Sequence, residues 1–167
     1  MEGTIVIEKM RSDDWEEVRA IYLEGIATGH ATFQKEAPSW EEWDYGHNAE
    51  CRIVACSEGE VVGWAALSPV SSRSVYSGVG EVSVYVSQKH NGKGIGSLLL
   101  KSLIEISEQN DFWTLQSSIF PENEGSIKLH KKYGFREVGR RERIGKMDGV
   151  WRDTVWLERR SRIVGDQ

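Results

Sequence analysis

The chain has 167 residues and a formal net charge of −5. This length suits a single domain spanning residues 1–167, and a hydrophobic content of 39% excludes a disordered chain. The acidic excess argues against a general nucleic-acid binder, because such domains carry a basic face. No apolar run approaches the roughly 20 residues that cross a bilayer, and the N-terminus lacks the apolar core of a signal peptide. We therefore expect a cytoplasmic protein with no nucleic-acid or membrane partner.

The first half of the chain predicts strands and short helices. Residues 4–8 (TIVIE) predict a strand, and apolar residues at helical spacing after Asp13 predict a helix. A polar link then leads to Ser39, which suits the N-cap of a short helix. Two apolar runs, residues 52–55 and 61–67, are joined by a Glu-Gly-Glu turn and predict a β-hairpin.

The two cysteines, Cys51 and Cys56, flank the first apolar run of that hairpin. Extended backbone separates them by roughly 16 Å and places them on opposite faces, so they cannot bridge within the strand. Their spacing also differs from zinc-binding patterns, and the histidines His30, His47 and His90 show no metal or triad spacing. We expect reduced thiols and no metal.

A strand, a loop and a long helix follow. Residues 81–86 (EVSVYV) alternate as a strand does, and residues 88–96 form a loop. A helix begins at about Ile95 and carries one apolar stripe that suits packing on a core.

The last part of the chain predicts a strand over residues 112–119, a helix over residues 123–134 and a strand pair over residues 135–143 and 150–157. The basic residues after this pair suggest that residues 158–167 form a solvated tail. The order of all these elements predicts an α/β (α+β) fold, with a mixed sheet and helices on both faces.

Three glycines lie together at the start of the long helix, in the segment NGKGIG from Asn91 to Gly96. Glycine permits a positive φ and the close approach of a ligand, and a helix N-terminus attracts phosphate. The segment lacks the phosphate-binding pattern of nucleoside triphosphatases. It also departs from the Rossmann fingerprint, because its third glycine comes one residue early. A coenzyme A pyrophosphate site and a simple glycine turn both remain open on this reasoning.

Longer segments resemble the GCN5-related N-acetyltransferase (GNAT) superfamily: EVSVYV followed by QKHNGKGIGSLLL, and then NEGSIKLHKKYGF. Three others, IYLEGIATGHATF, RSVYSGVGEVSVYV and VGRRERIGKMDGVWRD, are similar to its phosphinothricin and methionine sulfoximine N-acetyltransferase branch. The resemblance covers nearly the whole chain. It implies a single-domain GNAT-like fold with a mostly antiparallel sheet, and acetyl-CoA as the acetyl donor without a metal.

The resemblance implies three parts of a coenzyme site. The backbone of Ser83, Val84 and Tyr85 meets the pantetheine arm, and Asn123 and Ser126 lie near it. The pyrophosphate loop comprises Asn91, Gly92, Lys93, Gly94, Ile95 and Gly96. The superfamily usually has Gln or Arg in place of Asn91, but backbone donors are expected to carry most of the phosphate binding.

The resemblance also implies two catalytic residues. Glu81 occupies the position of the branch's general base, and partial burial in a valine-rich strand would raise its pKa. The alternative is a solvated carboxylate, or one paired with Arg73. His130 stands where many members place a tyrosine as general acid, and an imidazole can relay a proton near neutral pH.

The substrate site implied by the resemblance extends from the base. Arg73 and Tyr76 are expected to bind a carboxylate or phosphinate, since the arginine fork holds two oxygens. Phe33 is expected to form an aromatic wall, and Glu81 and Val82 to line the site.

These implications favour an acetyl-CoA-dependent N-acetyltransferase that acetylates the α-amine of a small amino acid or analogue by direct attack of the amine on the thioester. Two alternatives are a protein or peptide N-acetyltransferase and a non-catalytic acyl-CoA-binding module. Seven tryptophans exceed what one core usually takes, so we also expect a homodimer. Trp151 and Asp153 are expected at the subunit contact or the rim of the site, unless they pack in the core.

Overall fold

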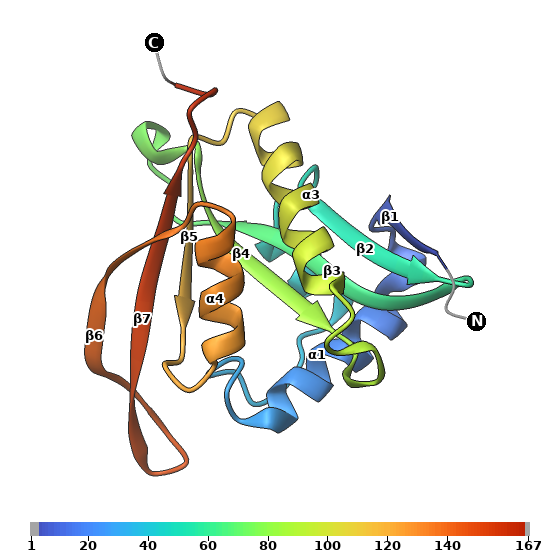
Figure 1. The fold of residues 1–167 in the computed structure, drawn as a ribbon, viewed down its shortest axis with the longest axis horizontal. Coiled ribbons are helices and arrows are strands. Elements are labelled where there is room, and N and C mark those ends of the chain that lie inside the picture. The colour runs from blue at the N-terminus through green and yellow to red at the C-terminus, as the bar shows by residue number, and fades with distance from the viewer. Residues whose placement is uncertain (1–3, 166–167) are drawn as a thin grey trace.

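The computed structural model describes residues 4–165, and its strands form one seven-stranded sheet (Figure 1). In spatial order the strands are β1 (Ile5–Lys9), β2 (Arg52–Ser57), β3 (Glu60–Pro69), β4 (Val79–Val86), β5 (Thr114–Ile119), β7 (Val150–Arg160) and β6 (Arg136–Met147). The helices are α1 (Trp15–Thr28), α2 (Trp40–Gly46), α3 (Ile95–Gln109) and α4 (Glu124–Lys132).

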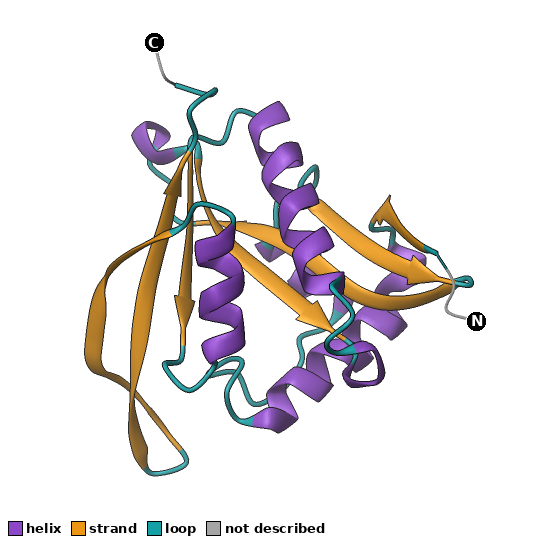
Figure 2. Cartoon of the chain, viewed as in Figure 1, coloured by secondary structure: helices purple, strands orange, loops and turns teal. Residues whose placement is uncertain are grey.

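The sheet opens between β4 and β5, which form the parallel pair of an otherwise antiparallel sheet. Their ladder extends only from the pair Val79 and Thr114 to the pair Glu81 and Gln116, and the strands then diverge (Figures 1 and 2). From Val82 onward β4 pairs only with β3. One backbone edge of β4 is therefore available to a ligand.

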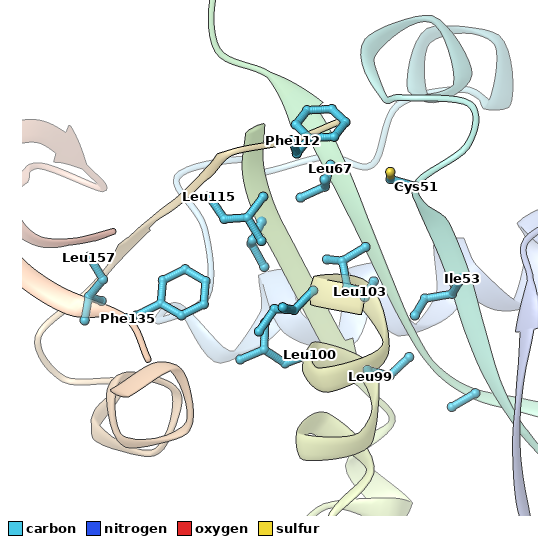
Figure 3. Close-up of a cluster of buried hydrophobic side chains, with 14 of the residues drawn as sticks. Cys51, Ile53, Leu67, Leu99, Leu100, Leu103, Phe112, Leu115, Phe135 and Leu157 are labelled. Atoms are coloured by element: carbon cyan, nitrogen blue, oxygen red, sulfur yellow. The ribbon is translucent and has the colours of Figure 1, made fainter. Parts of the chain in front are cut away.

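Helices cover both faces of the sheet, as the sequence predicted. On one face α3 packs Leu99, Leu100 and Leu103 against the strands, and all three are fully buried (Figure 3). Trp43 and Trp64 belong to a second cluster on the other face, beneath α1 and α2. Burying each large apolar side chain contributes roughly 1.5–3 kcal/mol, so these two clusters hold the strands in place.

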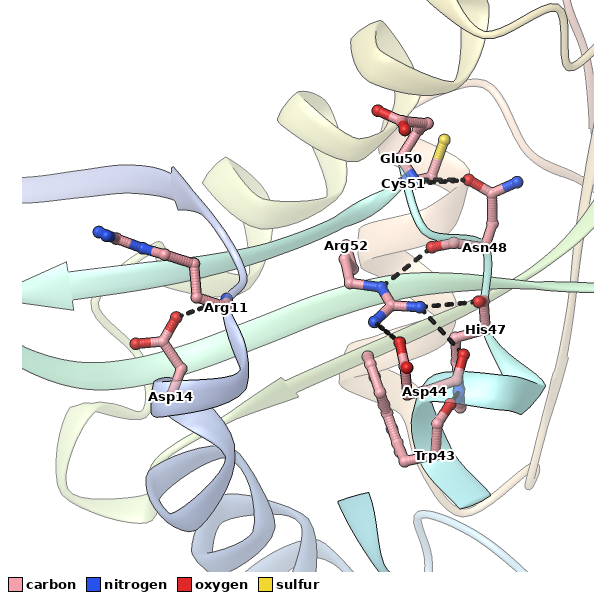
Figure 4. Close-up of polar contacts among 9 residues, drawn as sticks. All are labelled: Arg11, Asp14, Trp43, Asp44, His47, Asn48, Glu50, Cys51 and Arg52. Carbon is pink, nitrogen blue, oxygen red and sulfur yellow. Dashed lines mark hydrogen bonds and ion pairs between the residues drawn. The ribbon is translucent and has the colours of Figure 1, made fainter. Parts of the chain in front are cut away.

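A buried arginine joins α2 to β2 (Figure 4). Arg52 is 5% exposed, and its guanidinium donates to the Asp44 carboxylate at 2.5 Å. It also donates to the backbone carbonyls of Asp44, His47 and Asn48 at 3.1, 2.8 and 3.1 Å. The guanidinium centre lies 5.0 Å from the Trp43 ring. These contacts satisfy a charge that would be costly to bury alone.

The predicted helix cap and thiols are confirmed. The Ser39 side chain accepts a hydrogen bond from the Glu42 backbone N–H at 3.2 Å, which caps α2. Cys51 and Cys56 are free thiols, and burial raises the pKa of Cys51 to about 11. Within residues 4–165, no helix is long and apolar enough to cross a membrane.

The expected solvated tail is wrong for residues 158–161. β7 continues to Arg160 because its residues pair with β5, so the three consecutive charged residues 158–160 belong to a strand. Ser161 is 3% exposed, and its hydroxyl donates to Glu108 on α3 at 2.7 Å. Residues 166 and 167 lie outside the described part of the chain.

Candidate active site

A cavity of about 330 Å³ lies where β4 and β5 diverge. It is bounded by the free edge of β4, the end of β5, the start of α4 and the segment that follows α1. Its lining residues are Ala31, Thr32, Phe33, Gln34, Glu81, Val82, Ser83, Val84, Tyr85, Ser117, Ser118, Ile119, Phe120, Asn123, Ser126, His130 and Thr154. The divergence of the strands thus brings both predicted catalytic residues, Glu81 and His130, to one cavity.

Glu81 is the last residue of β4 that pairs with β5, and its side chain is partly buried. Burial raises the pKa of its carboxyl group, the positive charge of Arg141 lowers it, and the net shift is upward. Among the described residues its carboxylate makes no hydrogen bond or ion pair, so the alternative pairing with Arg73 is not observed. Glu81 is therefore a carboxylate with spare hydrogen-bonding capacity in the cavity wall.

His130 is 3% exposed, and its Nδ1 lies 2.7 Å from the backbone carbonyl oxygen of Ser126. Because a carbonyl oxygen only accepts, Nδ1 carries the proton and Nε2 of the neutral ring carries a lone pair. Nε2 is buried and has no partner among the described residues. Burial lowers the pKa of His130, although the Ser126 hydrogen bond opposes this shift. The ring thus presents an unused acceptor in the cavity wall.

The residues predicted to meet the pantetheine arm also come together. Ser83, Val84 and Tyr85 line the cavity from the unpaired edge of β4. Asn123 caps α4 by accepting the Ser126 N–H at 3.3 Å, and both residues line the cavity. An extended ligand with amide groups suits this combination, because a free strand edge offers regularly spaced donors and acceptors.

The glycine loop lies outside this cavity, at the start of α3. Gly92 and Gly94 both have φ of +79°, a conformation that strongly favours glycine. Gly94 is the N-cap of α3 and has no side chain to cap it, so N–H groups of the first turn point outward without helical acceptors. A Cβ on Gly96 would meet Leu129 of α4 at 3.4 Å and Val86 of β4 at 3.7 Å, which places the loop beside both elements of the cavity.

The predicted substrate residues divide into two groups. Phe33 and Val82 line the cavity, and Phe33 contacts Phe120 edge to face at 4.8 Å between ring centroids. Arg73 and Tyr76 are exposed and do not line it; the Arg73 guanidinium lies 5.7 Å from the Tyr76 ring. Tyr76 instead borders a separate hollow, together with Gln116, the strand partner of Glu81.

Two residues that the sequence did not single out are Thr154, which lines the cavity, and Arg141, whose charge acts on Glu81. The Thr154 hydroxyl is buried in the cavity wall and has no hydrogen-bond partner in the described structure. Arg141 influences Glu81 from β6, two strands beyond β5. No local motif marks either residue, because strand pairing brings them to the site. Within residues 4–165, no group of three or more metal-binding side chains occurs.

Residues 8–135 match the Acetyltransferase (GNAT) family. A phosphinothricin N-acetyltransferase of Streptomyces coelicolor is 31% identical over 155 residues, 88% of this chain and 91% of that protein. An L-amino acid N-acetyltransferase of Escherichia coli is 28% identical over 162 residues, which cover 93% of this chain and 97% of the Escherichia coli protein. The solved structure of a phosphinothricin acetyltransferase from Sinorhizobium meliloti in complex with AcCoA is 28% identical, with a TM-score of 0.87 and coverage of 98% of this chain and 92% of that one.

The match spans most of the chain, including the glycine loop and both residues predicted to be catalytic. The mixed, mostly antiparallel sheet and the helices on both of its faces agree with the fold expected from the sequence. The chain therefore belongs to the GNAT acetyltransferase family.

Proposed function

We propose that this protein is an acetyl-CoA-dependent N-acetyltransferase for the α-amine of a small amino acid or amino-acid analogue, of the phosphinothricin or methionine sulfoximine type. The observation that carries this proposal is the position of Glu81. This half-buried carboxyl group with a raised pKa lies where the free edge of β4 begins. A carboxylate base with a raised pKa, next to a site for an extended coenzyme, suits amine acetylation.

The residues present fit acetyl-CoA, whose thioester supplies an activated acetyl group. The free edge formed by Ser83, Val84 and Tyr85 would hold the pantetheine arm, with Asn123 and Ser126 opposite. The segment from Asn91 to Gly96 would hold the pyrophosphate. Its positive-φ glycines and uncapped helix N-terminus support this assignment, since backbone N–H groups bind phosphate without basic side chains.

The Glu81 carboxylate is proposed as the general base. A protonated amine cannot attack a carbonyl carbon, so the base must take a proton from the amine first. Partial burial brings the pKa of Glu81 closer to that of the amine and makes this transfer easier. Val82 and Phe33 would line the path of the substrate to this carboxylate.

His130 is proposed as the second catalytic group. Its neutral ring presents the Nε2 lone pair, so it can accept a proton or a hydrogen bond there. Donation of a proton from Nε2 to the departing sulfur would require the imidazolium form, which burial disfavours. The geometry thus supports acceptance at Nε2 more than the general-acid role suggested by the sequence.

A small substrate is favoured over a peptide because the cavity measures about 330 Å³ and Ala31, Thr32, Phe33 and Gln34 wall one side of it, whereas a peptide needs an open groove. The test is a thiol-release assay with acetyl-CoA and a panel of amines: methionine sulfoximine, phosphinothricin, the common L-amino acids and short peptides with free N-termini. We expect turnover with one or more amino acids. Turnover with peptides alone would favour a peptide acetyltransferase. Coenzyme binding by calorimetry without any turnover would favour a binding module.

We also propose that the protein acts as a cytoplasmic homodimer. Two free cysteines suit a reducing compartment. Three apolar side chains near the β6–β7 turn, Ile144, Val150 and Trp151, are 52%, 59% and 50% exposed. A subunit interface is a natural place for such residues. Light scattering after gel filtration tests this, and a mass of one chain at micromolar concentration would contradict it.

A further inference from the structure

One face of the sheet connects Glu81 to β6 through successive strand partners. Glu81 pairs with Gln116, and Ser118 lies two residues further along the same face of β5. Ser118 pairs with Trp156, Thr154 is two residues from Trp156, and Thr154 pairs with Arg141. The side chains of these residues therefore share one face, although they come from four strands.

Arg141 is held on this face by an aromatic ring. Its guanidinium centre lies 4.8 Å from the centroid of the Trp156 ring. Such a contact orients an arginine but leaves its N–H donors unused. Within the described structure the Arg141 guanidinium makes no hydrogen bond and no ion pair. By contrast, the neighbouring Arg140 donates to Asp153 at 2.8 Å, and Arg136 donates to Glu158 at 2.8 Å.

Two more donors beside Arg141 are unused. The Thr154 hydroxyl and the Trp156 indole nitrogen are buried and have no partner among the described residues. Thr154 is only 6% exposed and lines the cavity that contains Glu81. Buried donors without partners are costly, and a ligand that accepts their hydrogen bonds recovers this free energy.

We propose that Arg141 and Thr154 form the site that binds the α-carboxylate of the amino-acid substrate, with Trp156 as the platform for the guanidinium. This inference rests on the proposed function. A substrate with its amine at Glu81 and its carboxylate at Arg141 has each charged end beside a group of opposite charge. The carboxylate accepts hydrogen bonds from the arginine fork and the threonine hydroxyl.

This site differs from the one implied by the family resemblance, in which Arg73 and Tyr76 bind the carboxylate. Tyr76 borders a hollow that Gln116, the strand partner of Glu81, also lines. Thr154, the strand partner of Arg141, lines the cavity that contains Glu81, whereas neither Arg73 nor Tyr76 lines it. The positive charge of Arg141 also lowers the pKa of the Glu81 carboxyl group. Arg141 is therefore better placed to fix a carboxylate two bonds away from the reacting amine.

The test compares steady-state kinetics of the wild type with those of Arg141→Gln, Thr154→Val, Arg73→Gln and the matched control Arg140→Gln. Each protein is assayed with the best L-amino acid of the panel and with the amine that lacks only its carboxylate. We expect Arg141→Gln to raise KM for the amino acid by about 10- to 100-fold, the loss typical of a charge-assisted hydrogen bond. Thr154→Val should raise it by a smaller factor. Arg141→Gln and Thr154→Val should leave KM for the decarboxylated amine unchanged. The control Arg140→Gln should leave KM unchanged for both substrates.

The outcomes separate the inference from the function on which it rests. If Arg141→Gln raised KM by the same factor for both substrates, the carboxylate site would be overturned. It would also be overturned if only Arg73→Gln raised KM for the amino acid and not for the decarboxylated amine. A wild type that acetylates no amino acid would overturn the proposed function, and this site with it. Thermal unfolding of each variant controls for folding, because a folded Arg141→Gln with unchanged kinetics also contradicts the inference.

Discussion

The ring of His130 donates from Nδ1 to the backbone carbonyl of Ser126, one turn earlier in α4, at a distance of 2.7 Å. This bond selects the tautomer and leaves Nε2 as a buried acceptor in the cavity. Long-range proton–nitrogen NMR correlations of the histidine rings should show a protonated Nδ1 and an unprotonated Nε2 for His130 at pH 7.5. A signal for protonated Nε2 would contradict this arrangement.

The same histidine should make stability depend on pH. Burial lowers its pKa in the folded state, so the unfolded chain binds the proton more readily. Its contribution is present above the unfolded pKa of roughly 6.5 and is lost as pH falls through the folded value. We expect the free energy of unfolding in urea to fall between pH 7.5 and 5.5, and to fall less in His130→Asn. Burial also lowers the pKa of the half-buried His47, which contributes equally to both proteins, so equal changes in the two would refute the role of His130.

Glu81→Gln should abolish most of the activity without loss of coenzyme binding. Loss of a general base typically lowers kcat by roughly 10²- to 10⁴-fold. Glutamine keeps the size of the side chain but cannot accept the amine proton. Calorimetry should give the same Kd for acetyl-CoA as the wild type. The control is Glu105→Gln on the exposed side of α3, which should leave both quantities unchanged. An unchanged kcat in Glu81→Gln would remove Glu81 as the base.

Arg141 should also set the pH at which Glu81 loses its proton. Burial raises the pKa of the Glu81 carboxyl group, and the guanidinium charge lowers it. Removal of that charge in Arg141→Gln therefore raises this pKa further. The acid limb of kcat/KM, measured with the decarboxylated amine, should move to higher pH than in the wild type. A shift to lower pH would mean that the limb reports another group.

Alanine substitutions at two glycines with the same backbone conformation can distinguish an effect on coenzyme binding from the effect of backbone strain alone. Gly94 begins α3 and Gly59 lies in the β2–β3 turn; both have φ of +79° and open space where a Cβ would lie. Alanine at either position should cost about 1–2 kcal/mol of stability, because a side chain disfavours this region. Only Gly94→Ala should also weaken acetyl-CoA binding in calorimetry. Equal Kd values for the two variants would argue against the loop as the pyrophosphate site.

Replacing the buried Arg52 should lower the stability of the fold more than replacing an exposed arginine. Arg52→Met leaves the backbone carbonyls of Asp44, His47 and Asn48 without their donor, at about 1 kcal/mol each, or about 3 kcal/mol in total. Arg52→Lys should recover part of this, since an ammonium group cannot reproduce the planar fork. Exposed Arg19→Met on α1 is the control and should change stability by less than about 0.5 kcal/mol. Urea unfolding measures all three, and a loss below 1 kcal/mol for Arg52→Met would contradict the role of this network.

The sequence by itself determined most of the helices and strands, and it identified the candidate site residues that lie within recognisable motifs. The alternation in residues 81–86, the apolar stripe of α3 and the glycine segment are local patterns, so their structures follow from nearby residues. Glu81 and His130 were found by their places in family motifs, and both lie at the cavity. The end of β7 was missed because its charged residues resemble a tail until their pairing with β5 is known.

Only the tertiary structure decided what surrounds Glu81. The cavity exists because β4 and β5 separate after three residue pairs, and no local pattern encodes where parallel strands part. Arg141 and Thr154 reach the site through the registers of three strand pairs in succession, and a shift of one residue in any of them would turn their side chains to the other face. The positive charge near Glu81 thus depends on strand pairing across the sheet, and nearby residues in the sequence do not encode that pairing.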